Sequence, residues 1–263
     1  MESVVGTLYF VFTKTTHHTA TTSSSTTTAT EQQIICPHAG PSSVTFLLPK
    51  VNLTYYHEHG LFEGALMEWA KQFCTLDGLF LDIGAHTGTY ALSYADACAH
   101  VLAFEPQQMT YYALCGGVAL SNKTNVTCVP LALGSPDQVG RAMLNIRSTD
   151  GGGSSICSLP ASEIVLGHED VMVTTLDVYF DTVLHRRRKE PISFIKMDVE
   201  YNELNVLRGA VNTLRKHNYP TMLFEANPDS HQNAELFDFL QTTLMYRVVP
   251  IQGCDNMFLA VKS

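Results

Sequence analysis

The strongest constraint on the fold is a short apolar segment that ends in an acid and then turns through two glycines. It occupies residues 80–90 and reads FLDIGAHTGTY. A strand, a glycine turn and a helix start in this order are typical of parallel α/β sheets, which bind ligands at the carboxyl ends of their strands. Gly84 and Gly88 match neither the three-glycine dinucleotide motif nor the P-loop, which also needs a lysine. The turn therefore suits a nucleoside with a phosphate-free tail better than a pyrophosphate.

A second apolar segment supports this interpretation. Residues 100–104 end at Glu105, which lies 23 positions beyond Asp82. A carboxylate about twenty residues after a glycine turn, at the tip of the neighbouring strand, can accept hydrogen bonds from both ribose hydroxyls. Two carboxylates then flank one crevice, and S-adenosylmethionine is the ligand we expect there. The alternative is that Glu105 only stabilises the start of the helix after Pro106.

The rest of the chain alternates between strand-like and helix-like segments. We expect strands at residues 125–130, 141–146, 171–174, 191–198, 220–225, 246–251 and 257–261. Helices are expected at residues 107–120, 176–184 and 233–242, and another should bury a face made by Leu204, Leu207, Val211 and Leu214. This alternation predicts a doubly wound parallel sheet. The last two strands should form a hairpin that adds an antiparallel edge strand.

Six segments resemble, in order and spacing, those of the FkbM-like family of S-adenosylmethionine-dependent methyltransferases. They are DIGAHTGTYAL, VLAFEP, LALGS, VTTLD, FIKMDVEYNELNVLRGA and PTMLFEAN. The resemblance covers residues 55–263 and implies an α/β fold with a Rossmann-like, doubly wound seven-stranded methyltransferase sheet. It also implies O-methylation of a hydroxyl on a small metabolite or a sugar or glycan.

The resemblance further implies which residues bind the cofactor. The expected set is Asp82, Gly84, Ala85, His86, Gly88, Glu105, Leu131 and Ala132. Within it the glycine turn and its acid hold the methionine end, Glu105 holds the ribose, and the segment at Leu131 holds the adenine. Asp198 should lie beside the methyl group.

The chain departs from the family pattern at two places. His86 stands where the family usually has asparagine, and it keeps the ability to form a hydrogen bond. Tyr201 and Asn202 stand where the family has a glycine and a small residue, so we expect them to reshape the acceptor pocket. The glycine-rich loop at residues 151–155 is either a lid over the acceptor or a passive connection.

The chemistry of a methyl sulfonium limits what the enzyme must do. Its methyl group is already activated, so the protein mainly aligns an acceptor oxygen and removes its proton. Asp198 and Glu225 are the leading catalytic candidates, because each ends a predicted strand, with Glu200 and His86 as further candidates. Alternatively, Asp198, Glu225 and Asn227 hold a magnesium ion that lowers the pKa of the acceptor hydroxyl.

Two other functions fit parts of the pattern. Lys196 and Asp198 invite an RNA 2′-O-methyltransferase, but Lys196 should point to the opposite side of its strand from Met197. The net charge of −9 also argues against a general affinity for nucleic acid. A catalytically inactive S-adenosylmethionine-binding module is the second alternative, and the intact cofactor acids disfavour it.

The N-terminal part differs in composition from the rest. Residues 15–30 are almost wholly Ser and Thr, and such a tract cannot bury a core. Residues 4–12 are apolar but too short to span a membrane, and no basic residue precedes them. We therefore expect a mobile extension at residues 1–40 and a methyltransferase domain at residues 41–263. Seven cysteines without paired spacing suggest a reducing compartment, and we expect a cytoplasmic protein.

Overall fold

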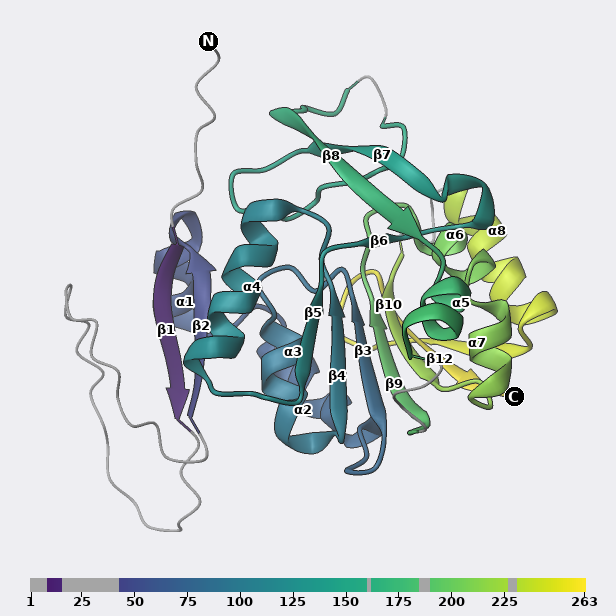
Figure 1. The fold of residues 1–263 in the computed structure, drawn as a ribbon, viewed down its shortest axis with the longest axis horizontal. Helices are drawn as coiled ribbons and strands as arrows, with labels where there is room; N and C mark the ends of the chain where they lie inside the picture. The colour runs from purple at the N-terminus through teal and green to yellow at the C-terminus, as the bar shows by residue number, and fades with distance from the viewer. Residues whose placement is uncertain (1–8, 16–42, 160–161, 185–189, 227–230) are drawn as a thin grey trace.

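The computed structural model describes residues 9–15, 43–159, 162–184, 190–226 and 231–263. At its centre is a seven-stranded sheet with strand order β11-β12-β10-β9-β3-β4-β5 (Figure 1). Its strands are β3 (Leu79–Ile83), β4 (His100–Phe104), β5 (Val126–Val129), β9 (Ile192–Met197), β10 (Thr221–Glu225), β11 (Tyr246–Pro250) and β12 (Met257–Lys262). The strands β10, β9, β3, β4 and β5 lie side by side in this order and run parallel to one another. The expected Rossmann-like α/β fold is therefore present.

The C-terminal hairpin lies at one edge of this sheet. Its second strand, β12, is antiparallel to both β10 and β11. The expected antiparallel strand is thus second from the edge, because β12 rather than β11 pairs with the parallel part of the sheet. The edge strand β11 itself runs in the direction of β10.

Helices cover both faces of the sheet. They are α1 (Leu53–His59), α2 (Gly64–Ala70), α3 (Thr89–Tyr94), α4 (Gln108–Leu120), α5 (Leu176–Tyr179), α6 (Glu203–Arg208), α7 (Val211–Lys216) and α8 (His231–Asp238). Short 3-10 or π segments are η1 (Lys50–Asn52), η2 (Lys71–Phe73), η3 (Ala95–Ala97), η4 (Pro136–Gln138), η5 (Phe180–Leu184) and η6 (Phe239–Thr243). Within the described ranges, every helix is too short or too polar to cross a bilayer.

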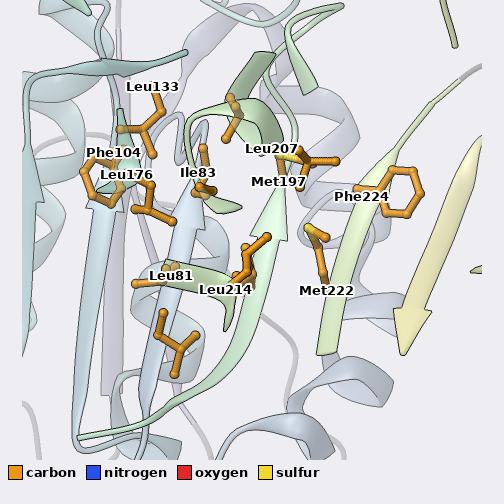
Figure 2. Close-up of a cluster of buried hydrophobic side chains, with 14 of the residues drawn as sticks. Leu81, Ile83, Phe104, Leu133, Leu176, Met197, Leu207, Leu214, Met222 and Phe224 are labelled. Carbon is orange, nitrogen blue, oxygen red and sulfur yellow. The ribbon is translucent and has the colours of Figure 1, made fainter. Parts of the chain in front are cut away.

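The side chains of β3 separate the two cores, because successive residues of a strand point to opposite faces. Leu81 and Ile83 pack in one cluster with α5, α6, α7 and α8, whereas Phe80 packs in a second cluster with α2 and α3. Figure 2 shows part of the first cluster. Its labelled members are Leu81, Ile83, Phe104, Leu133, Leu176, Met197, Leu207, Leu214, Met222 and Phe224.

The helix expected after β9 is divided into α6 and α7. The division falls at Gly209 and Ala210. A Cβ atom at Gly209 would lie 2.1 Å from the carbonyl oxygen of Gly134. The chain passes so close to the segment after β6 that only glycine fits, and the helical spacing of the apolar residues does not reveal this contact.

A small sheet lies beyond the carboxyl ends of β3 and β4 (Figure 1). It contains β6 (Ala132–Leu133), β7 (Gly140–Ile146) and β8 (Gly167–Thr174), in the order β6-β8-β7. β7 and β8 form an antiparallel pair. The segment between these two strands includes the glycine-rich loop, which is thereby brought to the end of the central sheet where ligands bind.

The expected N-terminal extension contains one element of the fold. β1 (Tyr9–Thr15) pairs antiparallel with β2 (Ser43–Pro49). The ring centroids of Phe12 and Phe46 are 6.4 Å apart, and Phe10 lies 5.9 Å from Tyr56. Residues 9–15 thus belong to the folded protein, because their alternating phenylalanines pack on β2 and α1. Residues 1–8 and 16–42, including the Ser/Thr tract, lie outside the described residues.

Candidate functional site

A cavity of about 380 Å³ lies at the carboxyl ends of β3, β4 and β9. The turn after β3 contributes Gly84, Ala85 and His86 to its wall. Glu105 follows β4 and Asp198 follows β9, and both also line the cavity. The sequence-predicted site residues at the ends of three neighbouring strands are therefore brought together, as the parallel sheet requires.

The two glycines of the turn have packing roles. Gly84 has a φ of +78°, and a Cβ there would lie 1.8 Å from the carbonyl oxygen of Asp198. Gly88 has a φ of +83°, and its Cβ would lie 2.4 Å from a methyl carbon of Leu114. Both positions need glycine for conformation and space. Gly84 lines the cavity, whereas Gly88 is not among the described residues of its wall.

Asp82 lies behind the cavity wall. Its side chain is 0% exposed, and its Oδ2 atom accepts a hydrogen bond from the Ala91 backbone N–H of α3 at 2.9 Å. Burial raises the pKa of Asp82 to about 6, against the opposing attraction of Lys196, its neighbour in register on β9. Its Oδ1 atom has no hydrogen-bond partner among the described residues. Asp82 therefore anchors α3 under the turn and balances the charge of Lys196.

Glu105 is buried and joins the turn to α4. Its Oε2 atom accepts from the His86 backbone N–H and its Oε1 atom from that of Gln107, each at 2.8 Å. Burial raises the pKa of Glu105 to about 7, although both backbone hydrogen bonds oppose this. Glu105 therefore also binds the backbone at the start of α4, as the alternative interpretation expected. A carboxylate has about four lone-pair sites, so two remain for ribose hydroxyls.

One side of the cavity is apolar. Leu131 and Ala132, which the family resemblance assigns to the adenine, line it. Other apolar residues of the wall are Phe104, Pro106, Leu133, Leu144 and Ile156, of which Leu144 and Ile156 pack in one cluster with Ala132. An apolar slot beside a buried carboxylate matches a flat base attached to a ribose. The residues present therefore fit the nucleoside part of S-adenosylmethionine.

The sequence did not assign Lys196, which forms an ion pair with Asp198, to the site. The Lys196 Nζ atom donates to Asp198 Oδ2 at 3.1 Å and to the Gly84 carbonyl oxygen at 3.3 Å. Burial alone lowers the pKa of Lys196, but Asp198, Asp82 and Glu63 together raise it. Lys196 is on the face opposite Met197, as expected, and that face leads its long side chain to the cavity.

A second pair missed by the sequence faces the same space. The Tyr90 hydroxyl donates to Glu63 Oε2 at 2.8 Å, and both residues line the cavity. Lys196 Nζ lies 5.3 Å from the centre of the Tyr90 ring. Tyr90 is inside the glycine-turn motif and was available to sequence reasoning. Glu63 directly precedes α2, in a connection without any such signal.

His86 fastens the glycine-rich loop. Its Nε2 atom donates to the Asp150 carbonyl oxygen at 2.8 Å, and burial lowers the pKa of His86, which favours the neutral ring. Asn52 Nδ2 donates to Asp150 Oδ2 at 2.8 Å. Residues 151–154 line the cavity. The loop is therefore a wall of the site, and His86 acts here as a loop contact.

Asp198 is followed by a turn with two residues in the left-handed region. Glu200 has a φ of 51° and Tyr201 a φ of 75°. Glu200 and Asn202 line the cavity, whereas the Tyr201 ring is exposed and lies 5.7 Å from the Arg147 guanidinium. Asn202 is buried and donates to the Leu133 carbonyl oxygen at 3.0 Å. Only Asn202 of the expected pair therefore shapes the cavity.

Glu225 stands apart from the cavity wall in the described structure. Burial raises its pKa to about 7, with Asp198, Glu200 and Glu63 adding to the effect. Asn227, the third expected magnesium ligand, lies outside the described residues. No group of three or more His, Cys, Asp or Glu residues in the described ranges is arranged to hold a metal ion. The magnesium alternative therefore gains no support.

Comparison with known proteins gives one family. Residues 82–248 match the family described as "Methyltransferase FkbM domain". A comparison with curated proteins gave no match.

Several solved structures resemble the chain in overall fold. An O-methyltransferase from Bacillus cereus in complex with SAH is 9% identical with a TM-score of 0.47, over 81% of this chain and 88% of that chain. A precorrin-6y C5,15-methyltransferase from Geobacter metallireducens is 12% identical with a TM-score of 0.44, over 76% and 87%. At this level of similarity the neighbours do not define the reaction of this chain.

Proposed function

The chain belongs to the FkbM methyltransferase family, and on that premise we propose that it transfers a methyl group from S-adenosylmethionine to a hydroxyl oxygen of a small metabolite or glycan. The observation that carries the proposal is the contact between Lys196 and Asp198 at the cavity wall. It supplies an oriented carboxylate at the end of the strand next to the glycine turn.

The apolar side and Glu105 support a defined cofactor orientation. The adenine would rest against Leu131 and Ala132, and the ribose hydroxyls would donate to the free lone pairs of Glu105. The methionine end would then lie along Gly84 and Ala85. When bound, S-adenosylmethionine supplies a methyl group on a positively charged sulfur, which needs no further activation.

Asp198 would act on the acceptor. Its Oδ2 atom is held by Lys196, so the Oδ1 atom is the one assigned to the acceptor hydroxyl. Bound S-adenosylmethionine would supply the methyl group to the acceptor oxygen and leave as S-adenosylhomocysteine, and Asp198 would accept the proton that the acceptor hydroxyl loses. This combines alignment with general-base catalysis. Glu225, whose pKa burial raises to about 7, is the second catalytic candidate, but it is not among the described residues of the cavity wall, so Asp198 ranks before it.

The charge of the cavity bears on the RNA alternative. Among the described residues, five carboxylates line it, from Glu63, Glu105, Asp150, Asp198 and Glu200, against one ammonium, that of Lys196. A phosphate backbone needs cationic contacts. The Lys196 ammonium is already bound by Asp198 and Gly84, so a small, phosphate-free acceptor is favoured over RNA.

Two measurements test the proposal. Calorimetry should detect binding of S-adenosylmethionine and of S-adenosylhomocysteine. Labelled S-adenosylmethionine should then transfer its methyl group to a component of a metabolite and glycan panel, in a product that survives mild base as an ether does and an ester does not. Cofactor binding without transfer would favour an inactive module, whereas base-labile label would rule out an ether product.

A further inference from the structure

Another part of the cavity wall combines acids with a partly exposed aromatic ring. Phe62 and Glu63 are adjacent in sequence and both line the cavity. The Phe62 ring stacks on Tyr55 with a centroid distance of 4.0 Å and an interplanar angle of 18°. Phe62 nevertheless remains 40% exposed. It is thus a supported aromatic surface at the edge of the site.

Aromatic surfaces of this kind suit a particular ligand chemistry. The face of an aromatic ring carries negative partial charge and attracts positively polarised edges such as C–H groups. A sugar ring presents C–H groups on its face and hydroxyl groups around its rim. Phe62 can therefore support the face of such a ring while neighbouring groups bind its rim.

The neighbouring groups are hydrogen-bond acceptors. Ionised carboxylates accept hydrogen bonds and donate none. The Glu63 carboxylate accepts one described hydrogen bond, from the Tyr90 hydroxyl. Glu200 contacts Arg147 at 3.5 Å, and Asp198 contacts Lys196. All three keep acceptor capacity for hydroxyl donors.

The negative charge of the cavity wall disfavours acceptors that carry a carboxylate or a phosphate. Lys196 is shared among several acids, and His86 is neutral because burial lowers its pKa. No other lysine or arginine is among the described residues of the cavity wall. An acceptor with a carboxylate or phosphate would face excess negative charge in a site partly shielded from water.

We infer that the methyl acceptor is a hydroxyl-rich ring without an anionic group, of the sugar or cyclitol class, that stacks on Phe62 and donates its hydroxyls to Glu63, Asp198 and Glu200. This rests on the proposed function, since it assigns the acceptor half of the same site. It adds a specificity rule: the acceptor carries no anionic substituent.

The test uses the full chain saturated with S-adenosylhomocysteine. Saturation-transfer NMR would compare methyl α-glucopyranoside with methyl α-glucopyranosiduronate, in which a carboxylate replaces the hydroxymethyl group. We expect the neutral sugar to receive saturation and the uronate to bind about tenfold more weakly, because like charges disfavour it. Glu200→Gln should narrow this difference.

Substitutions of Phe62 provide the second part of the test. Phe62→Ala should abolish saturation of the sugar, and Phe62→Trp should retain it because the aromatic surface is kept. Trp69→Ala is the matched control, since Trp69 is also an exposed aromatic, 42% exposed, but outside this cavity. It should leave sugar binding unchanged.

The other outcomes overturn the inference. Uronate binding as strong as that of the neutral sugar would remove the charge rule. Absence of sugar binding, with S-adenosylhomocysteine still bound in calorimetry, would remove the acceptor class and leave the proposed methyl transfer intact. If the unmodified protein does not bind S-adenosylhomocysteine, both the proposed function and this inference are contradicted.

Discussion

The ammonium group of Lys196 and the carboxylate of Asp198 are in contact, with 3.1 Å between Nζ and Oδ2. Lys196 is buried, whereas the Asp198 side chain is 31% exposed and faces the cavity. The pair therefore has one end fixed in the core and one end available to an acceptor. The same ammonium donates to the Gly84 carbonyl oxygen, so the glycine turn and the end of β9 are held as one unit.

Replacing the exposed member of this pair should separate chemistry from binding. We predict that Asp198→Asn keeps cofactor affinity within a few-fold but lowers turnover by about a hundredfold to ten-thousandfold, the usual loss for a general base. Asp96→Asn is the matched control, because Asp96 contacts Lys123 at 2.7 Å outside the cavity. Single-turnover transfer of labelled methyl and calorimetry give the two quantities. Near-normal turnover of Asp198→Asn would move attention to Glu225.

Removing the Glu105 carboxylate should weaken the cofactor. Glu105→Ala removes the expected ribose acceptor, so we predict an affinity loss of about 1–3 kcal/mol, or roughly 5- to 150-fold. Glu169→Ala is the control, since Glu169 accepts from the Gln108 backbone N–H at 2.7 Å but lies outside the cavity. Calorimetry with S-adenosylhomocysteine measures both. Equal affinities of the two variants would contradict the ribose assignment.

Glu203 should make stability depend on pH. It is buried and accepts from the Val199 backbone N–H, and burial raises its pKa from 4.5 to about 7. The folded state therefore keeps this proton at pH values where the unfolded state has lost it. The free energy of unfolding should fall as pH rises through this window and the penalty should then stay constant at higher pH.

The difference in free energy of unfolding between Glu203→Gln and the unmodified protein isolates the contribution of Glu203. Glu203→Gln should gain stability relative to the unmodified protein between about pH 5 and about pH 8, as measured by urea unfolding. Opposite contributions from His86 and His217, whose pKa values burial lowers, cancel in the difference. Glu235→Gln is the surface control. Parallel stability curves for Glu203→Gln and the unmodified protein would show that Glu203 titrates normally.

The packing of β1 predicts a contribution of residues 9–15 to stability. Phe12→Ala should lower the free energy of unfolding by about 1–3 kcal/mol, because the half-buried ring packs on Phe46. Val11, on the opposite side of the strand, is 62% exposed, so Val11→Ala should change the free energy of unfolding by at most about 0.5 kcal/mol. Chemical denaturation measures both. A null effect of Phe12→Ala would mean that β1 adds nothing to the folded state.

The order of the strands along the sequence explains why several expected site residues line one cavity. Glu105, Leu131 and Asp198 each follow an apolar strand, and parallel strands bring their carboxyl ends to one edge. Order along the chain therefore translates directly into position in space. Gly88 belongs to the glycine-turn motif, but it allows close packing against Leu114. The sequence pattern alone does not distinguish such a packing role from contact with a ligand.

The acceptor half is less predictable because its residues lack periodic signals. Phe62 and Glu63 come from a short connection between α1 and α2, and Asp150 from the excursion between β7 and β8. Only their long-range contacts bring them to the cavity. β1 shows the same limitation, since its partner β2 is separated from it by the Ser/Thr tract and pairing of this kind leaves little local trace.

The division of the cavity between strand ends and connecting segments has a consequence for engineering. Phe62 and the loop at residues 151–154 belong to connections, whereas Glu105 and Asp198 are fixed by the strand ends that precede them. On the proposed assignment, exchanging these connections for those of another protein should change which acceptor fits, while the groups at the strand ends stay in place. Acceptor preference would then be separable from the part of the site that the sheet itself fixes.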